Sequence, residues 1–176
     1  MTMRPKIISI FGSSKARPGD ASYRGALRLG QALARAGFVV CNGGYAGLME
    51  ARARGAKEAG GKTFGIPTRQ FKGGRCNPWI DRASVAKNWK ERLFKLIETG
   101  DGYVVCDGGT GTLVEFACVW EMLKKGLMPS KPVVIFGKDW KRVIRALYRV
   151  PEIGRDARLY FASTPAQVVR LLERNL

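Results

Sequence analysis

Short apolar runs alternate along the chain with longer segments in which apolar residues recur at helical spacing. The runs, rich in β-branched and aromatic residues, lie at 6–11, 38–42, 63–67, 102–106, 132–136 and 158–161. The helical segments lie at approximately 21–36, 46–59, 84–98, 112–126, 139–149 and 165–175. Apolar strands that alternate with helices are typical of parallel βαβ units. The pattern predicts a single doubly wound, Rossmann-like α/β domain over 1–176, with about six or seven parallel strands and helices on both faces.

Chain length and composition narrow the class of protein. With 176 residues the chain is near the usual size of one domain. Its longest apolar runs span a few residues, whereas a membrane helix needs about 20, and the amino terminus lacks the apolar segment of a signal peptide. We therefore expect a cytoplasmic protein without membrane contact. Its four cysteines, none in a C-x-x-C pair, are expected to be reduced thiols.

The sequence contains no histidine, and this absence limits the chemistry available to it. It excludes histidine general bases, Ser-His-Asp nucleophiles and the commonest zinc ligand. We expect neither a metal nor a cofactor, so any catalysis would rest on carboxylates, arginine or lysine.

The formal charge of +17 favours anionic partners, and residues 1–88 hold 16 Lys and Arg against 4 Asp and Glu. Nucleic acid is one such partner. However, the positive charges are scattered and no nucleic-acid-binding motif accompanies them. A basic, solvated surface is therefore the favoured interpretation, and nucleic acid is the weaker hypothesis.

Three glycine-rich turns follow predicted strands, at the edge of the sheet where doubly wound folds bind ligands. The first contains Gly12, Ser13 and Ser14, the second, with the start of its helix, Gly43, Gly44, Gly47 and Met49, and the third Gly108, Gly109, Thr110, Gly111 and Thr112. Glycine lets the backbone approach a ligand, and free N–H groups at a helix start favour phosphate. One such turn is also what tight packing requires, but three together favour binding of a phosphate group. The P-loop and G-x-G-x-x-G patterns are both missing, which argues against a P-loop NTPase and an ordinary NAD dehydrogenase.

These turns resemble those of the LOG (lonely guy) family, whose motif P-G-G-x-G-T-x-x-E is paired with an arginine on an upstream helix. The third turn matches through Glu115, and Arg92 precedes Glu115 by the family's spacing. The resemblance, which runs from about 7 to 137, implies hydrolysis of the N-glycosidic bond of AMP or of a cytokinin-type nucleoside 5′-monophosphate. The products are the free base and ribose 5-phosphate, and Arg92 and Glu115 would be the catalytic residues.

The resemblance further implies a homodimer whose interface includes the helix of Trp89 and Arg92 and the helix after Glu115. The wider superfamily also includes nucleotide-binding proteins and molybdenum-cofactor carriers. A non-catalytic carrier that uses the same three turns is therefore the alternative function.

Two residues depart from the family pattern. Asp107 replaces the motif's proline, where its carboxylate either weakens phosphate binding or accepts hydrogen bonds from loop amides. Leu93 follows Arg92, where plant-type members have lysine, and this departure weakens the cytokinin-specific assignment.

Both proposed catalytic residues also have a structural interpretation. Glu115, placed in the first turn of its helix, completes a capping box with Thr112 and would then only close the helix start. Arg92 lies at the edge of an apolar stripe, where it faces either a cleft or solvent. Trp89, on that stripe, is assigned to the core or to a subunit interface.

Overall fold

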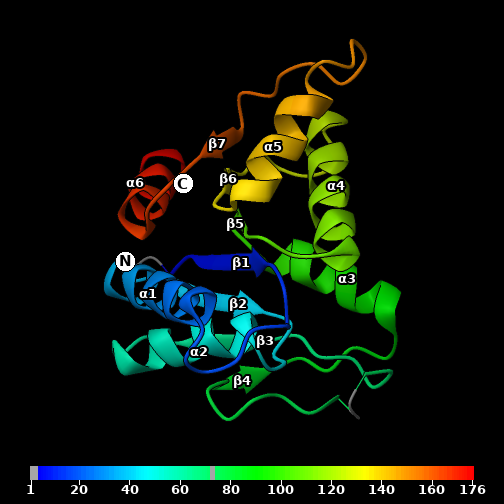
Figure 1. The fold of residues 1–176 in the computed structure, drawn as a ribbon. Coiled ribbons are helices and arrows are strands. Elements are labelled where there is room, and N and C mark those ends of the chain that lie inside the picture. Colours follow the sequence, from blue (N-terminus) through cyan, green and yellow to red (C-terminus); the bar gives the residue numbers. More distant parts are fainter. Residues whose placement is uncertain (1–3, 72–73) are drawn as a thin grey trace.

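Seven parallel strands form one sheet in the order β4-β3-β2-β1-β5-β6-β7 (Figure 1). The structure is a computed structural model that describes residues 4–71 and 74–176. The strands are β1 Ile7–Phe11, β2 Val39–Asn42, β3 Thr63–Gly65, β4 Arg82–Ala83, β5 Gly102–Val105, β6 Val133–Ile135 and β7 Leu159–Phe161. The sheet starts at its centre with β1, grows outward to β4, and resumes beside β1 with β5. The predicted doubly wound fold is confirmed.

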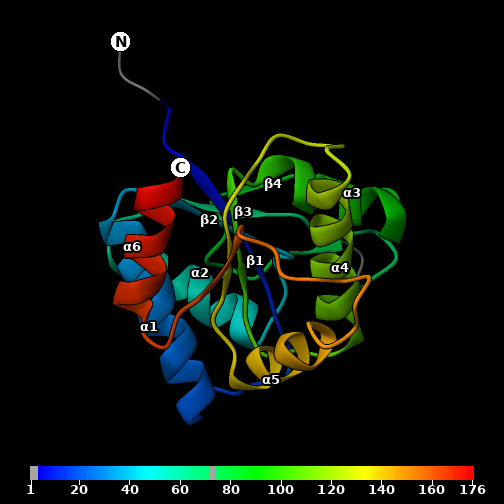
Figure 2. The same cartoon turned by 90° about the horizontal axis from the view of Figure 1, so that it is seen from above.

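The helices cover both faces of this sheet. They are α1 Ala21–Arg35, α2 Leu48–Glu58, α3 Trp89–Thr99, α4 Thr110–Lys124, α5 Lys138–Leu147 and α6 Pro165–Asn175. α1, α2 and α6 pack on one face, and α3, α4 and α5 pack on the other (Figure 2). In β5, Val104 points into the first layer, whereas Tyr103 and Val105 point into the second. Because both faces are buried, the central strands are mostly apolar.

Two predicted boundaries are wrong. The segment 84–98 was expected to be helical throughout, but α3 begins only at Trp89, because the Asn88 side chain caps it by accepting a hydrogen bond from Glu91 N. Residues 84–88 form no regular element apart from a bridge between Ala86 and Thr68. β4 lies just before this segment, and its two residues are exposed and give no apolar signal. The next helix begins at Thr110 instead of residue 112, with Gly109 as its N-cap.

Helices α1 and α2 approach each other closely enough for their backbones to touch. A Cβ at Gly30 would lie 2.0 Å from the carbonyl oxygen of Arg52, and one at Gly55 would lie 2.1 Å from that of Leu27. Only glycine fits at such distances. This contact fixes the backbone of α2 below the first turn.

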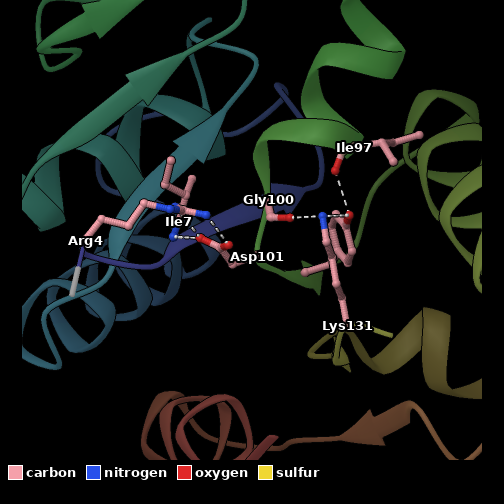
Figure 3. Close-up of polar contacts among 7 residues, drawn as sticks. Arg4, Ile7, Ile97, Gly100, Asp101 and Lys131 are labelled. Carbon is pink, nitrogen blue, oxygen red and sulfur yellow. Dashed lines mark hydrogen bonds and ion pairs between the residues drawn. The ribbon is translucent and has the colours of Figure 1, made fainter. Parts of the chain in front are cut away.

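The amino ends of β1 and β5 are joined by Asp101 (Figure 3). Its carboxylate accepts hydrogen bonds from Ile7 N at 2.8 Å and from both terminal nitrogens of Arg4. Beside it, Lys131 Nζ donates to Gly100 O, and Tyr103 Oη donates to Ile97 O at 2.6 Å. These contacts align the two central strands and hence the turns at their other ends.

Among the helices in the described ranges, none has both the length and the apolar composition that spanning a bilayer requires.

Candidate functional site

The three predicted turns touch one another at the carboxyl edge of the sheet. Ser13 N donates to Asp107 O at 3.1 Å, which joins the first turn to the third. A Cβ at Gly47 would lie 2.0 Å from Ser14 O, so the second turn packs against the first. The predicted convergence of the turns is therefore correct.

The third turn opens into solvent at the start of α4. Cβ atoms at Gly109 and Gly111 would meet no other atom within 4 Å, and the side chain of Thr110 is exposed. Thr112 is buried, and its Oγ1 would lie 2.2 Å from a Cβ at Gly108. The turn thus presents free backbone N–H groups at the positive end of a helix.

A hollow of about 340 Å³ lies between the first and third turns. Its lining includes Ser13, Gly108 and Gly109 from the predicted set. Lys15 and Ser22 also line it, and their positions in the sequence gave no sign of this role. Asp107 lines the hollow as well, but its carboxylate accepts hydrogen bonds from the amides that start α5. Lys15 and the glycine turn therefore suit this hollow to an anionic group.

The second turn holds the catalytic arginine that the family resemblance implies. A Cβ at Gly43 would lie 2.0 Å from Arg92 Nη2 and 2.9 Å from Met49 Sδ, so Gly43 leaves the room that the guanidinium occupies. Gly44 and Gly47 have φ values of 79° and 71°, which residues other than glycine rarely adopt. Gly43 therefore makes room for Arg92, whereas Gly44 and Gly47 set the backbone course of the turn.

Arg92 and Glu115 form a buried ion pair. Arg92 Nη1 lies 3.5 Å from Glu115 Oε1, and the side chains are 10% and 13% exposed. Arg92 Nε donates to Ile66 O at 3.0 Å, and its Cζ lies 5.6 Å from the centre of the Tyr45 ring. These contacts fix the guanidinium from three sides. The interpretation of Arg92 as a solvated edge residue is wrong.

The capping-box interpretation of Glu115 is also wrong. Because α4 begins at Thr110, Glu115 lies in the second turn of the helix, and its carboxylate points to Arg92. Burial raises the pKa of Glu115 to about 7, although the charges of Arg92 and Arg52 oppose that rise. A carboxyl group with such a pKa changes its charge near neutral pH, as acid–base groups in active sites do.

Arg52 is the residue that the sequence analysis missed. It is 1% exposed, and its positive charge acts on both Glu115 and Cys106. The signal that would have found it is its position in α2. Arg52 follows Met49 by three residues and Leu48 by four, so a charged residue lies on the buried stripe of its helix.

The structure explains both departures from the family motif. Asp107 accepts hydrogen bonds from the backbone N–H groups of Lys138 and Asp139 at 3.2 and 3.1 Å, so its carboxylate caps α5. Leu93 is buried in the core below α3. Trp89 is 39% exposed, so its assignment to the core is wrong, whereas its assignment to an interface stays a prediction.

The parallel sheet and its converging glycine turns define a Rossmann-like α/β protein. The chain belongs to the SLOG cluster4 family, whose model matches residues 5–158. It is 33% identical over 130 residues to an uncharacterized protein of Archaeoglobus fulgidus, covering 74% of this chain and 83% of that protein. It is 29% identical over 140 residues to a cytokinin riboside 5′-monophosphate phosphoribohydrolase of Rhodococcoides fascians, covering 77% and 69%. The family model and this second relative confirm the resemblance to LOG proteins.

A solved structure extends the similarity over nearly the whole chain. The molybdenum cofactor binding protein of the phototrophic bacterium Rippkaea orientalis is 27% identical, with a TM-score of 0.79 and 98% of each chain covered. The two kinds of relative therefore share the fold but differ in the function that their names give.

Proposed function

We propose that the chain binds a nucleoside 5′-monophosphate at the carboxyl edge of its sheet and hydrolyses the N-glycosidic bond to free base and ribose 5-phosphate. The observation that carries this proposal is the buried ion pair of Arg92 and Glu115 beside the third turn. The relationship to the phosphoribohydrolase of Rhodococcoides fascians supports the same reaction.

The chemistry of the bond explains what the ion pair would do. As the bond between the ribose C1′ and the base nitrogen breaks, positive charge builds up on the sugar ring. The ionised carboxylate of Glu115 stabilises that charge and orients the water whose oxygen bonds to C1′. One proton of the water stays on the new C1′ hydroxyl and the other ends on the departing base, so the reaction needs no cofactor. Arg92 holds the carboxylate in place and would contact the ribose.

The third turn would hold the 5′-phosphate. Gly109 and Gly111 leave open space in front of the free N–H groups of α4, and Thr110 adds an exposed hydroxyl. A phosphate there gains from both the hydrogen bonds and the helix dipole. The first turn, with Ser13 and Ser14, would contact the ribose or the base.

A carrier that binds without turnover is the second candidate function. The similarity to the molybdenum cofactor binding protein of Rippkaea orientalis, over 98% of both chains, favours it. The three turns would then hold the phosphate of a bound cargo, and Glu115 would take no part in chemistry. The two candidates differ in one respect that can be measured, which is whether base is released.

A homodimer is proposed as the working unit. Four apolar side chains are exposed on neighbouring helices, Trp89 and Phe94 on α3 and Leu113 and Val114 on α4. Exposed apolar side chains on two helices of one face are of the kind that subunit interfaces bury. Sedimentation equilibrium tests this proposal. Phe94→Lys should dissociate the dimer, and Val143→Lys, at an exposed apolar position on α5, should not.

The experiment that tests the reaction follows free base by chromatography during incubation with AMP and with an N6-prenylated AMP. Wild type should release base, and Arg92→Ala and Glu115→Gln should each lose at least about a hundredfold in kcat/KM. Glu121→Gln is the matched control, because it removes an exposed carboxylate from the same helix. If wild type releases no base while AMP still raises its Tm, the carrier replaces the hydrolase.

A further inference from the structure

Arg52 differs from the other enclosed arginines of the chain. Arg92 pairs with Glu115 and donates to a backbone carbonyl, and Arg158 pairs with Asp156 and also donates to a carbonyl. Arg52 Nε and Nη1 are buried and have no hydrogen-bond partner within the described residues. Within the residues that the structure describes, no carboxylate forms an ion pair with Arg52. A buried guanidinium with two unsatisfied nitrogens and no ion pair is costly, so a structural role alone does not account for it.

The guanidinium lies directly beneath the first turn. A Cβ at Gly12 would be 2.8 Å from Arg52 Nη2, 3.0 Å from Nη1 and 3.2 Å from Cys106 Cβ. Gly12 is therefore the one layer of backbone above the charge, and the absence of a side chain lets it lie there. The hollow that Ser13, Lys15 and Gly108 line begins at the residue after Gly12.

Arg52 has no carboxylate at ion-pair distance within the described residues. The guanidinium groups of Arg52 and Arg92 both act on the carboxylate of Glu115, but only Arg92 pairs with it. Asp107, which lines the hollow, keeps its negative charge while it accepts hydrogen bonds from the neutral amides that start α5, and it forms no ion pair with either guanidinium. The charge of Arg52 therefore acts unpaired in a medium of low dielectric, where its field is strong. An anion bound in the hollow would pair with it.

We propose that Arg52 is the counter-charge for a phosphate group bound in the hollow between the first and third turns, because its guanidinium, with Nε and Nη1 unsatisfied, lies one backbone layer below Gly12. The inference deepens the proposed nucleotide binding, because it assigns the selection of a phosphorylated ligand over its uncharged nucleoside to a buried arginine. The packing of α1 against the Arg52 carbonyl holds this residue rigidly in place.

The test compares Arg52→Met, which keeps the shape and removes the charge, with Arg54→Met on the same helix, where the side chain is partly exposed and paired with Glu58. The probes are inorganic phosphate, AMP and adenosine, followed by thermal shift and titration calorimetry. Arg52→Met should bind AMP and phosphate at least tenfold more weakly and adenosine as wild type does. Its Tm without ligand should equal or exceed that of wild type, because an unpartnered buried charge has been replaced by an apolar chain. Arg54→Met should keep wild-type affinity for all three probes.

Arg52→Lys keeps the proposal testable if Arg52→Met does not fold. It keeps the charge but loses the fork of donors, so phosphate affinity should fall about threefold to tenfold. Unchanged phosphate affinity in either folded variant overturns the proposal, as does a wild type that neither phosphate nor AMP stabilises. Failure of the proposed hydrolase activity would give a different set of results. Wild type would release no base, yet phosphate would stabilise wild type and not Arg52→Met, and the role of Arg52 would stand.

Discussion

Arg92 and Glu115 lie side by side, with 3.5 Å between Nη1 and Oε1, although they come from different helices. The contact exists because α3 and α4 pack on the same face of the sheet and because Gly43 leaves room for the guanidinium. This packing fixes the geometry of the ion pair. Small changes in the turns should therefore alter its chemistry more than they alter the fold.

The pH dependence of base release should report the ionisation of Glu115. Burial raises the pKa of this carboxyl to about 7, so kcat/KM should fall about tenfold per pH unit below pH 7 and level off above it. The ionisation of the substrate phosphate, with a pKa of about 6, lies roughly one unit lower and can be separated by titrating AMP alone. The carboxyl ¹³C shift of Glu115 should give a midpoint near 7 independently. A midpoint close to 4.5 would contradict the burial of a reactive carboxyl group.

Gly111→Ala should separate ligand binding from stability. The new methyl group meets no protein atom and replaces glycine inside a helix, so the free energy of unfolding should stay level or rise by up to about 1 kcal/mol. The same methyl occupies the open space in front of α4, so the Kd for AMP should rise at least tenfold. Gly25→Ala is the control, because it makes the same change in α1, also with nothing within 4 Å. AMP affinity that survives in Gly111→Ala would place the phosphate elsewhere.

The fold could be predicted from the sequence because its signals are local. The central strands are mostly apolar on both sides and each glycine turn follows a strand, so β1 and its glycine turn were found together. The two-residue β4 could not be found, because its residues are exposed and it pairs with β3 only through backbone.

The site was predicted less completely, because its parts meet only in three dimensions. Family spacing suggested that Arg92 and Glu115 act together, but the capping interpretation of Glu115 depended on a helix start that was wrong by two residues. Arg52 was missed because a charged residue on the buried stripe of a helix indicates a function only when the element packed above it is known. For Arg52 that element is the turn at Gly12.

Gly30→Ala should destabilise the protein, although alanine is the better helix former. The added Cβ would lie 2.0 Å from the carbonyl oxygen of Arg52, and backbone cannot move aside as a flexible side chain does. Urea unfolding should show a loss of about 1–3 kcal/mol, as in other overpacked interiors. Gly25→Ala in the same helix should show no loss. Equal stability of the two variants would mean that α1 and α2 are farther apart than described.

Asp101→Asn should lower the free energy of unfolding at pH 7 by about 1 kcal/mol, because it weakens hydrogen bonds that a charged acceptor makes stronger. Burial opposes ionisation of this carboxyl, but the Ile7 amide and the Arg4 guanidinium outweigh it, so its pKa lies below the usual 3.8. The ionised group therefore stabilises the fold above pH 3.8, and that stabilisation is lost as the pH falls through the lower, folded-state value. Urea unfolding should show the full difference between wild type and variant at pH 7 and a smaller one at pH 3.

Arg4→Met tests whether the loss of stability in Asp101→Asn comes from the hydrogen bond with Ile7 N or from the exposed ion pair with Arg4. The Arg4 side chain is 67% exposed, so water screens its ion pair, and its loss should cost well under about 1 kcal/mol. The bond from Ile7 N to Asp101 would remain, and with it the alignment of β1 and β5 (Figure 3). If Arg4→Met proved the more damaging change, the exposed pair would be what joins the strands. If the loss in Asp101→Asn were the same at pH 3 and pH 7, it would come from packing and not from the charge.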